Sequence, residues 1–122
     1  MTRSRRPVDR IRKVLLAQGA YYVATGVAPF VSRSAFEAVT GPKREWWLVE
    51  TVGVLVTAVG AGLIAAAARG RVTPELHTIA TGCASGLAAI DVVYVARRRI
   101  APTYLADAAI QIALLAGQAR AR

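Results

Sequence analysis

The chain has 122 residues, 55% of them hydrophobic, a mean hydropathy of +0.41 and a formal net charge of +9. Its sixteen basic residues gather in five clusters, at 1–13, 32–45, 69–75, 97–100 and 120–122, which punctuate long apolar stretches. A soluble nucleic-acid binder would spread Arg and Lys over a polar face, so the pattern argues against nucleic acid as a partner and predicts a membrane protein whose basic loops contact anionic lipid.

The first apolar stretch follows a basic segment, residues 1–10, which we expect to be disordered or to lie on lipid headgroups. We predict a membrane span over 11–31. A signal peptide is the competing interpretation, but the stretch is long, contains Gln18 and two tyrosines, and lacks a clean cleavage site. Pro29 should end or kink this helix near its exit.

The longest loop, residues 32–45, separates the first span from the second. Ser34 is the expected N-cap of a short interfacial helix over 35–39, with Phe36 dipping into the bilayer. Thr40, Gly41 and Pro42 then break the helix.

The second span is the clearest in the chain and runs over 46–68 with a single charge. At about 1.5 Å per residue its 23 residues reach roughly 34 Å, enough to cross a hydrocarbon core of about 30 Å. It opens on a tryptophan pair, typical of the headgroup region, and Arg69 and Arg71 follow its far end.

The third span is predicted over 75–96, with Thr73 as N-cap and Pro74 at the first helical position. It contains Gly82 and Gly86 in a G-x-x-x-G pattern, which favours close packing of helices within the chain, with homodimerisation as the alternative. Glycines of the first two spans suggest the same tight packing; they are Gly19, Gly26, Gly53, Gly60 and Gly62.

The fourth span, predicted over 100–117, is the shortest and most polar. Four spans make one all-α membrane domain, a four-transmembrane-helix bundle over residues 1–122, with both termini on the same side. The terminal side then carries ten basic residues and the other side six, so the positive-inside rule places both termini in the cytoplasm and the protein in the cytoplasmic (inner) membrane.

Three acidic residues lie inside the apolar spans: Glu50, Asp91 and Asp107. Each is about 6–10 Å below the same membrane face, at roughly 1.5 Å per residue. An aromatic residue stands about one helical turn nearer that face in each case. These aromatic residues are Trp46, Trp47, Tyr94 and Tyr104.

Further polar groups extend this layer toward the middle of the membrane. Gln111 lies one turn beyond Asp107, and Gln18, Tyr21 and Tyr22 belong to the first span. Because an ionisable group in a span costs about 2.5–3.5 kcal/mol, it is a functional candidate. We expect a pocket for a small lipophilic or cationic ligand. Two alternatives remain: a structural or interaction subunit whose polar cluster only stabilises the bundle, and an oligomeric proton- or cation-coupled transporter.

Catalysis, cofactors and metals have little support in the sequence. Cys83 and His77 are the only cysteine and histidine, which leaves no metal-ligand set and no Ser-His-Asp triad. We expect no cofactor and no metal, and an enzyme only if it were a membrane isomerase or hydratase that uses the three carboxylates.

The layout resembles the DoxX-like group of small four-helix bacterial membrane proteins. The shared features are Pro29-Phe30 at the end of the first span, Thr40-Gly41 in the loop, Ile90-Asp91 late in the third span, and Tyr104-Leu105 two residues before Asp107. A looser similarity to EXPERA-type four-helix proteins implies an intramembrane carboxylate pocket for amine or sterol-like ligands, with Glu50, Asp91 and Asp107 as its candidates.

Overall fold

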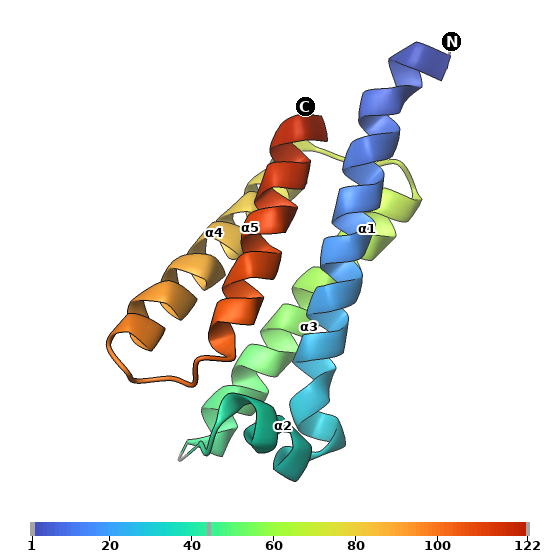
Figure 1. The fold of residues 1–122 in the computed structure, drawn as a ribbon. Coiled ribbons are helices and arrows are strands. Elements are labelled where there is room, and N and C mark those ends of the chain that lie inside the picture. Colours follow the sequence, from blue (N-terminus) through green and yellow to red (C-terminus); the bar gives the residue numbers. More distant parts are fainter. Residues whose placement is uncertain (1, 44, 122) are drawn as a thin grey trace.

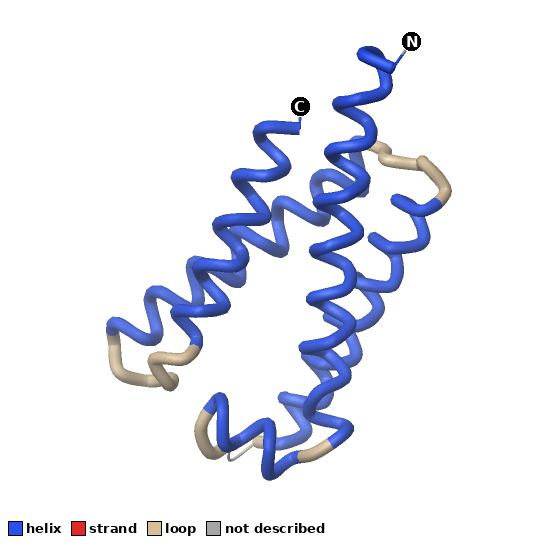
Figure 2. The backbone as a smooth tube through the Cα atoms, turned by 45° about the vertical axis from the view of Figure 1, so that its right-hand side comes forward, coloured by secondary structure: helices blue, strands red, loops and turns tan. Residues whose placement is uncertain are grey.

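Five helices make up the fold of the protein in the computed structural model, which describes the backbone of residues 2–43 and 45–121 and the side chains of residues 9–43 and 45–120. The helices are α1 (Thr2–Val31), α2 (Arg33–Thr40), α3 (Trp46–Ala68), α4 (Pro74–Ala96) and α5 (Tyr104–Ala121). The described residues contain no strand, which confirms the all-α prediction. Four long helices run up and down, and their connections lie at two opposite ends (Figures 1 and 2).

Three helical segments of the described chain are long and apolar enough to cross a membrane. They are Asp9–Val31, Trp46–Ala68 and Pro74–Ala96. These match the first three predicted spans closely. Helix α5 is not among them, because its 18 residues include an aspartate, two glutamines and an arginine.

Helix boundaries correct two predictions and confirm a third. The basic segment, expected to be disordered or to lie on lipid headgroups, is helical from Thr2 onward, and α1 ends at Val31, two residues after Pro29. The N-cap of α2 is Ser32 rather than Ser34, because the Ser32 hydroxyl accepts a hydrogen bond from the Ala35 N–H at 3.1 Å. The predicted cap of α4 is confirmed, since the Thr73 hydroxyl accepts from the Leu76 N–H at 3.2 Å.

The Glu37 carboxylate of α2 binds the loop that follows this helix. Glu37 accepts a hydrogen bond from the Lys43 N–H at 2.7 Å and another from Arg33 Nε at 3.3 Å. The pKa of Glu37 is lower than its ordinary value, chiefly because the carboxylate accepts the hydrogen bond from the Lys43 N–H. The positive charge of Arg33 lowers this pKa further. Phe36, expected to dip into the bilayer, packs edge-on against the Trp46 ring at a centroid distance of 5.7 Å.

Helices α1 and α3 pack back to back through two reciprocal glycine pairs. A Cβ at Gly60 would lie 2.7 Å from the Gly19 carbonyl oxygen, and one at Gly19 would lie 2.7 Å from the Gly60 carbonyl oxygen. The same reciprocal distance of 2.7 Å relates Gly26 and Gly53. Only glycine permits so close an approach of two helix backbones, so the predicted tight packing is confirmed for these four residues.

The remaining long helices form a second pair, α4 against α5, and α1 joins the two pairs through its contact with α5. Helix α4 presents a narrow stripe of small buried side chains, Ala80, Ala84 and Ala88, which continues into Asp91. Figure 1 shows α4 beside α5 and α1 beside α3, with both chain termini at one end. Gln18 and Tyr22 of α1 are buried in the interior of the bundle.

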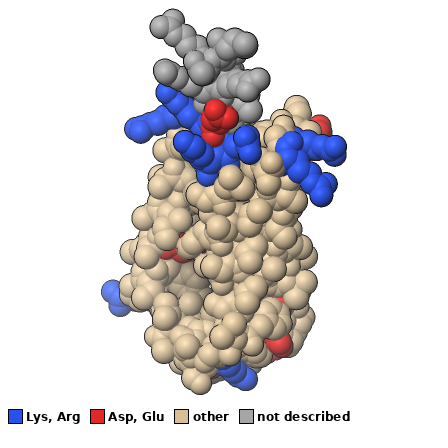
Figure 3. Space-filling model, turned by 90° about the vertical axis from the view of Figure 1, so that its right-hand side faces the viewer, with Lys and Arg blue, Asp and Glu red and all other residues tan. Residues whose placement is uncertain are grey.

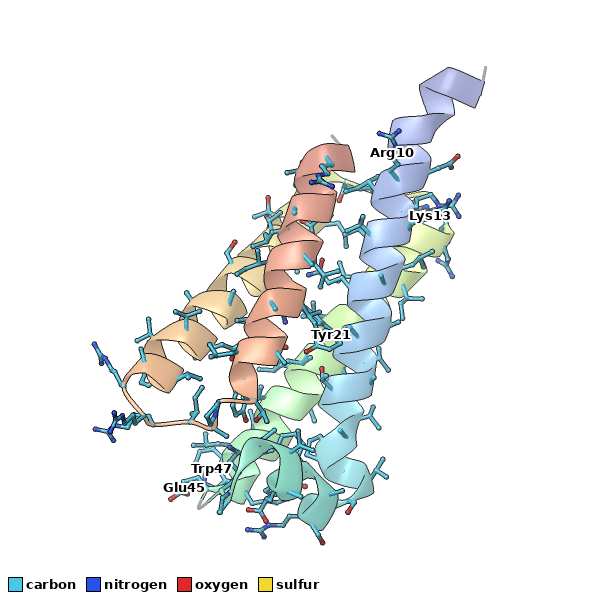
Figure 4. The ribbon with its side chains drawn as sticks, in the orientation of Figure 1. Arg10, Lys13, Tyr21, Glu45 and Trp47 are labelled. Atoms are coloured by element: carbon cyan, nitrogen blue, oxygen red, sulfur yellow. The ribbon has the colours of Figure 1, made fainter. Side chains whose placement is uncertain are left out.

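Charged side chains lie at the two ends of the molecule. Figure 3 shows Lys and Arg gathered toward the end that carries the chain termini, a few at the opposite end, and a broad band between them almost without charge. Arg10 and Lys13 mark the first end, and Glu45 and Trp47 the second (Figure 4). A band of apolar surface between two charged rims is the surface expected of a membrane protein.

Candidate functional site

Two acidic side chains come from neighbouring helices of the bundle. Asp91 lies on α4 and Asp107 in the first turn of α5, and these two helices pack against each other. Asp91 is only 5% exposed, and its Oδ2 atom has no hydrogen-bond partner among the described residues. A buried carboxyl oxygen without a partner costs free energy, so this atom marks a place where a ligand could contribute a bond.

Asp107 is surrounded by donors from two helices. The Tyr21 hydroxyl of α1 donates to Asp107 Oδ1, and Gln111 Nε2, one turn along α5, donates to the same atom at 3.3 Å. Figure 4 shows Tyr21 projecting from α1 into the space beside α5. The donors to Asp107 thus come from two helices, α1 and α5.

A chain of hydrogen bonds continues from Gln111 through the bundle. The buried Tyr22 hydroxyl donates to Gln111 Oε1 at 2.7 Å, and Gln18 Nε2 donates to Tyr22 Oη at 3.2 Å. Gln18 Nε2 also donates to the Ala80 carbonyl of α4 at 2.9 Å, and Gln118 Nε2 donates to Gln18 Oε1. We call the seven side chains the polar chain; its members are Asp91, Asp107, Tyr21, Gln111, Tyr22, Gln18 and Gln118.

Because the polar chain is buried, the loss of any one of its hydrogen bonds lowers the stability of the fold. Gln18, Gln111 and Gln118 are at most 1% exposed, as is Tyr22. Removing one partner leaves another group buried without a hydrogen bond, at a cost of about 1–3 kcal/mol. The polar chain therefore fixes how α1, α4 and α5 dock, in addition to any role in binding.

Glu50 does not join the aspartates. It is half-buried on α3, and its side chain has no hydrogen bond or ion pair with any residue that the structure describes. The predicted common depth brings Asp91 and Asp107 together, because α4 and α5 are neighbours. Helix α3 packs on α1 instead, and this separates Glu50 from the pair.

The predicted aromatic layer lies at the loop end, where its rings meet cations. Arg33 lies 4.7 Å from the Trp46 ring centroid, Lys43 lies 5.1 Å from that of Tyr104, and Arg97 lies 5.9 Å from that of Tyr94. Trp47 is 62% exposed and donates from Nε1 to Glu45. This arrangement is typical of an interfacial aromatic belt rather than of a pocket lining.

Gly82 and Gly86 do not pack against another helix of this chain. Both are exposed, and a Cβ at either would meet no atom of the described residues within 4 Å, so the expected intrachain packing of this pair is wrong. They line an apolar groove of about 290 Å³ between α3 and α4 instead. Its other lining residues are Tyr22, Leu55, Val56, Val59, Cys83, Leu87 and Ile90.

The groove and the polar chain share one side chain. Tyr22 lines the groove, while its hydroxyl lies between Gln18 and Gln111. Ile90, at one end of the lining, directly precedes Asp91 in α4. Neither Asp91 nor Asp107 is among the lining residues, so Tyr22 is the side chain through which the groove and the polar chain meet.

Sequence reasoning gave too little weight to Tyr21 and missed Gln118. Tyr21 was expected to supply a hydroxyl near mid-membrane, and in the structure it is a direct partner of Asp107. Gln118 lies just beyond the predicted end of the fourth span. Its spacing of seven from Gln111 and eleven from Asp107 puts all three on one helix face, and that is the signal that could have found it.

The described residues contain no group of three His, Cys, Asp or Glu side chains placed to hold a metal ion. Comparison of the chain with protein-family models, with curated proteins and with solved structures found no match. Any functional conclusion must therefore rest on the geometry of the polar chain and the groove.

Proposed function

We propose that the chain is a small integral membrane protein with four spans, α5 being the fourth. At about 1.5 Å per residue the 18 residues of α5 reach roughly 27 Å, close to the thickness of a hydrocarbon core. Its polar residues Gln111 and Gln118 are buried against the bundle, whereas Ile110 and Ile112 are exposed. The face of α5 turned outward is thus more apolar than its average composition.

The orientation follows from the basic residues. Both termini lie at the end that holds most of them (Figure 3), with ten by sequence against six at the other end. The positive-inside rule supports cytoplasmic termini in an inner membrane, and basic loops suit anionic lipid. The resemblance to DoxX-like bacterial proteins is part of this proposal.

The function that the geometry supports best is binding of a small lipophilic or cationic ligand at Asp91. The observation that carries it is the buried Oδ2 of Asp91, which has no hydrogen-bond partner among the described residues. A cation or hydrogen-bond donor at this atom would offset the cost of burying it. In this proposal the apolar body of the ligand lies in the groove between α3 and α4, whose lining includes Tyr22 of the polar chain.

A structural role is the second candidate, supported by the satisfaction of most of the polar chain. Every polar side-chain atom of Tyr22, Gln18 and Gln111 that is fully buried has a partner. The transporter alternative has less support, because three glutamine amides interrupt the carboxyls and tyrosines. An amide donates and accepts hydrogen bonds but does not readily exchange its protons for a relay.

The test is a thermal-shift screen of the detergent-purified protein against lipophilic amines, sterols and quinones, from about pH 5 to about pH 8. A binding site at the pair predicts a ligand that stabilises the wild type and has no effect on Asp91→Asn or Asp107→Asn. Glu50→Gln is the matched control, since it neutralises a half-buried carboxylate away from the pair. Loss of thermal stability in both aspartate variants, with no stabilising compound at any pH, would leave only the structural role.

A further inference from the structure

One face of α4 is left uncovered by the rest of the described chain along the whole length of the helix. Its residues recur every three or four positions, so they share one side of the helix, and all of them are exposed. Gly82 and Gly86 lie in the middle of this face, with open space in front of both. We call it the α4 stripe; its members are Glu75, Ile79, Gly82, Gly86, Ile90, Val93 and Arg97.

Helix α3 has a stripe of the same kind on the side turned toward α4. Its residues recur with the same spacing and are exposed or half-buried. Gly62 also has open space in front of it. The members of this α3 stripe are Leu48, Val52, Leu55, Val59, Gly62 and Ala66. The apolar groove lies between the two stripes, because Leu55 and Val59 line it from one side and Gly82 and Gly86 from the other.

The two stripes of one chain are held apart. Helix α3 packs on α1 and α4 packs on α5, and no comparable contact joins α3 to α4 within the described residues. The buried Tyr22 side chain lies in the groove, and its hydroxyl is fixed by hydrogen bonds with Gln18 and Gln111. Closing the groove within one chain would displace Tyr22 and break these bonds. Whatever covers the two stripes therefore comes from outside the chain.

Side-chain sizes on the two stripes are complementary at equal depth. Helix α3 begins and α4 ends at the same end of the bundle (Figure 1), so depth can be counted inward from that end on both helices. Three levels match a large side chain with a glycine to within one residue: Leu55 with Gly86, Val59 with Gly82, and Ile79 with Gly62. An α3 stripe and an α4 stripe from different copies can thus interlock.

Charges at the helix ends are complementary in the same register. Glu45 precedes α3 and Arg97 follows α4 at one end of the bundle, whereas Arg69 follows α3 and Glu75 lies at the start of α4 at the other. All four side chains are exposed, and none belongs to either of the two ion pairs among the described side chains. An α3 helix beside the α4 helix of another copy brings opposite charges together at both membrane faces.

We propose that two copies of this chain form a dimer in which α4 of each copy packs along α3 of the other and covers its groove. A two-fold axis perpendicular to the membrane gives both copies the same orientation and makes the contacting α3 and α4 helices antiparallel, as the charges require. Gly82 and Gly86 let the two α4 helices approach closely at the centre of the interface. The dimer is independent of the proposed ligand, whose apolar body would lie beneath the second copy.

The experiment measures energy transfer between donor-labelled and acceptor-labelled copies in vesicles of phosphatidylethanolamine and phosphatidylglycerol, over a range of protein-to-lipid ratios. The wild type should show the transfer of a dimer. Gly86→Leu should weaken the dimer about tenfold or more, because leucine overfills the closest contact. Each copy should still fold, since a Cβ at Gly86 meets no described atom within 4 Å, and an unchanged melting temperature of the monomer in a dissociating detergent checks this.

Ser85→Leu is the matched control for Gly86→Leu. Ser85 is exposed on the same helix, but it points about 100° away from Gly86 around the helix axis. The Ser85→Leu protein should dimerise as the wild type does. A Gly86→Leu dimer as tight as that of the wild type, or equal weakening by both variants, would contradict the proposed interface.

Charge exchange tests the register. Glu45→Arg and Arg97→Glu should each weaken the dimer about fivefold, because each brings like charges together, and the combined variant should recover the affinity of the wild type. A combined variant weaker than either single one would refute the register. A wild type that is monomeric at every ratio, which leaves the stripes to lipid or to another protein, would overturn the dimer. Ligand binding at Asp91 is measured separately by thermal shift, so the two proposals can fail independently.

Discussion

Replacing Gly60 by alanine tests whether the α1–α3 contact is as close as the structure shows. The new Cβ would lie 2.7 Å from the Gly19 carbonyl oxygen and 2.9 Å from both the Tyr22 Cβ and the Val23 backbone nitrogen. Ordinary contact begins at 3.4 Å, so the helices would have to separate by about 0.7 Å. Two of the three atoms belong to the backbone, which cannot move aside as a side chain does.

The magnitude follows from two opposing terms. Overpacking costs about 1–3 kcal/mol, and a clash with backbone on two sides belongs in the upper half of that range. Alanine recovers about 0.5–1 kcal/mol of helix propensity. We therefore expect Gly60→Ala to lower the free energy of unfolding by about 1–2.5 kcal/mol, which corresponds to a fall of about 4–10 °C in the melting temperature of a domain of this size.

The assay is thermal unfolding in detergent, with Gly62→Ala as the matched control. Gly62 is in the same helix, two residues away, but a Cβ there would meet no atom within 4 Å. Gly62→Ala should leave the melting temperature unchanged or raise it, because it gains helix propensity without a clash. If both variants moved the melting temperature in the same direction and by similar amounts, the back-to-back packing of α1 on α3 would be wrong.

Two further predictions concern the ends of helices. The hydrogen bond from the Lys43 N–H holds the pKa of Glu37 below its ordinary value. The ionised Glu37 therefore stabilises the fold at any pH above its unfolded-state pKa, and this stabilisation is lost as the pH falls through its folded-state pKa. Melting temperatures measured down the acid range should therefore fall more for the wild type than for Glu37→Gln, and parallel curves would contradict this. Thr73→Ala removes the N-cap bond to Leu76 and should cost about 1 kcal/mol, while Thr78→Ala, which only removes a bond back to Pro74, should cost much less.

Much of the fold could be predicted because the spans are encoded locally. The apolar stretch over 46–68 becomes α3 with the same bounds, and Thr73 followed by Pro74 fixes the start of α4. The start of the last helix was predicted less accurately. Ile100 and Ala101 are apolar, yet they belong to the connection before Tyr104. Apolar composition alone does not separate a helix from the turn that leads into it.

The site could be predicted only in part, because depth is local information and helix pairing is not. Residue counts from the span ends put Asp91, Asp107 and Glu50 in one layer. Such counts cannot show which helices pack together. In the structure α1 directs its tyrosines toward α5, and α3 packs on the other side of α1. Glu50 therefore lies apart from the two aspartates. Gly82 and Gly86 show the same limit, since a small-residue pattern predicts close approach without naming the helix that approaches.

The division of contacts along α1 has a consequence for biogenesis. Its glycines face α3, the next long helix to be synthesised, whereas Gln18, Tyr21 and Tyr22 find their partners on α4 and α5. When only helices α1, α2 and α3 have been synthesised, α1 can therefore already pack on α3. Its three polar side chains still lack their partners at that stage. The arrival of α4 and α5 then satisfies these groups and completes the bundle.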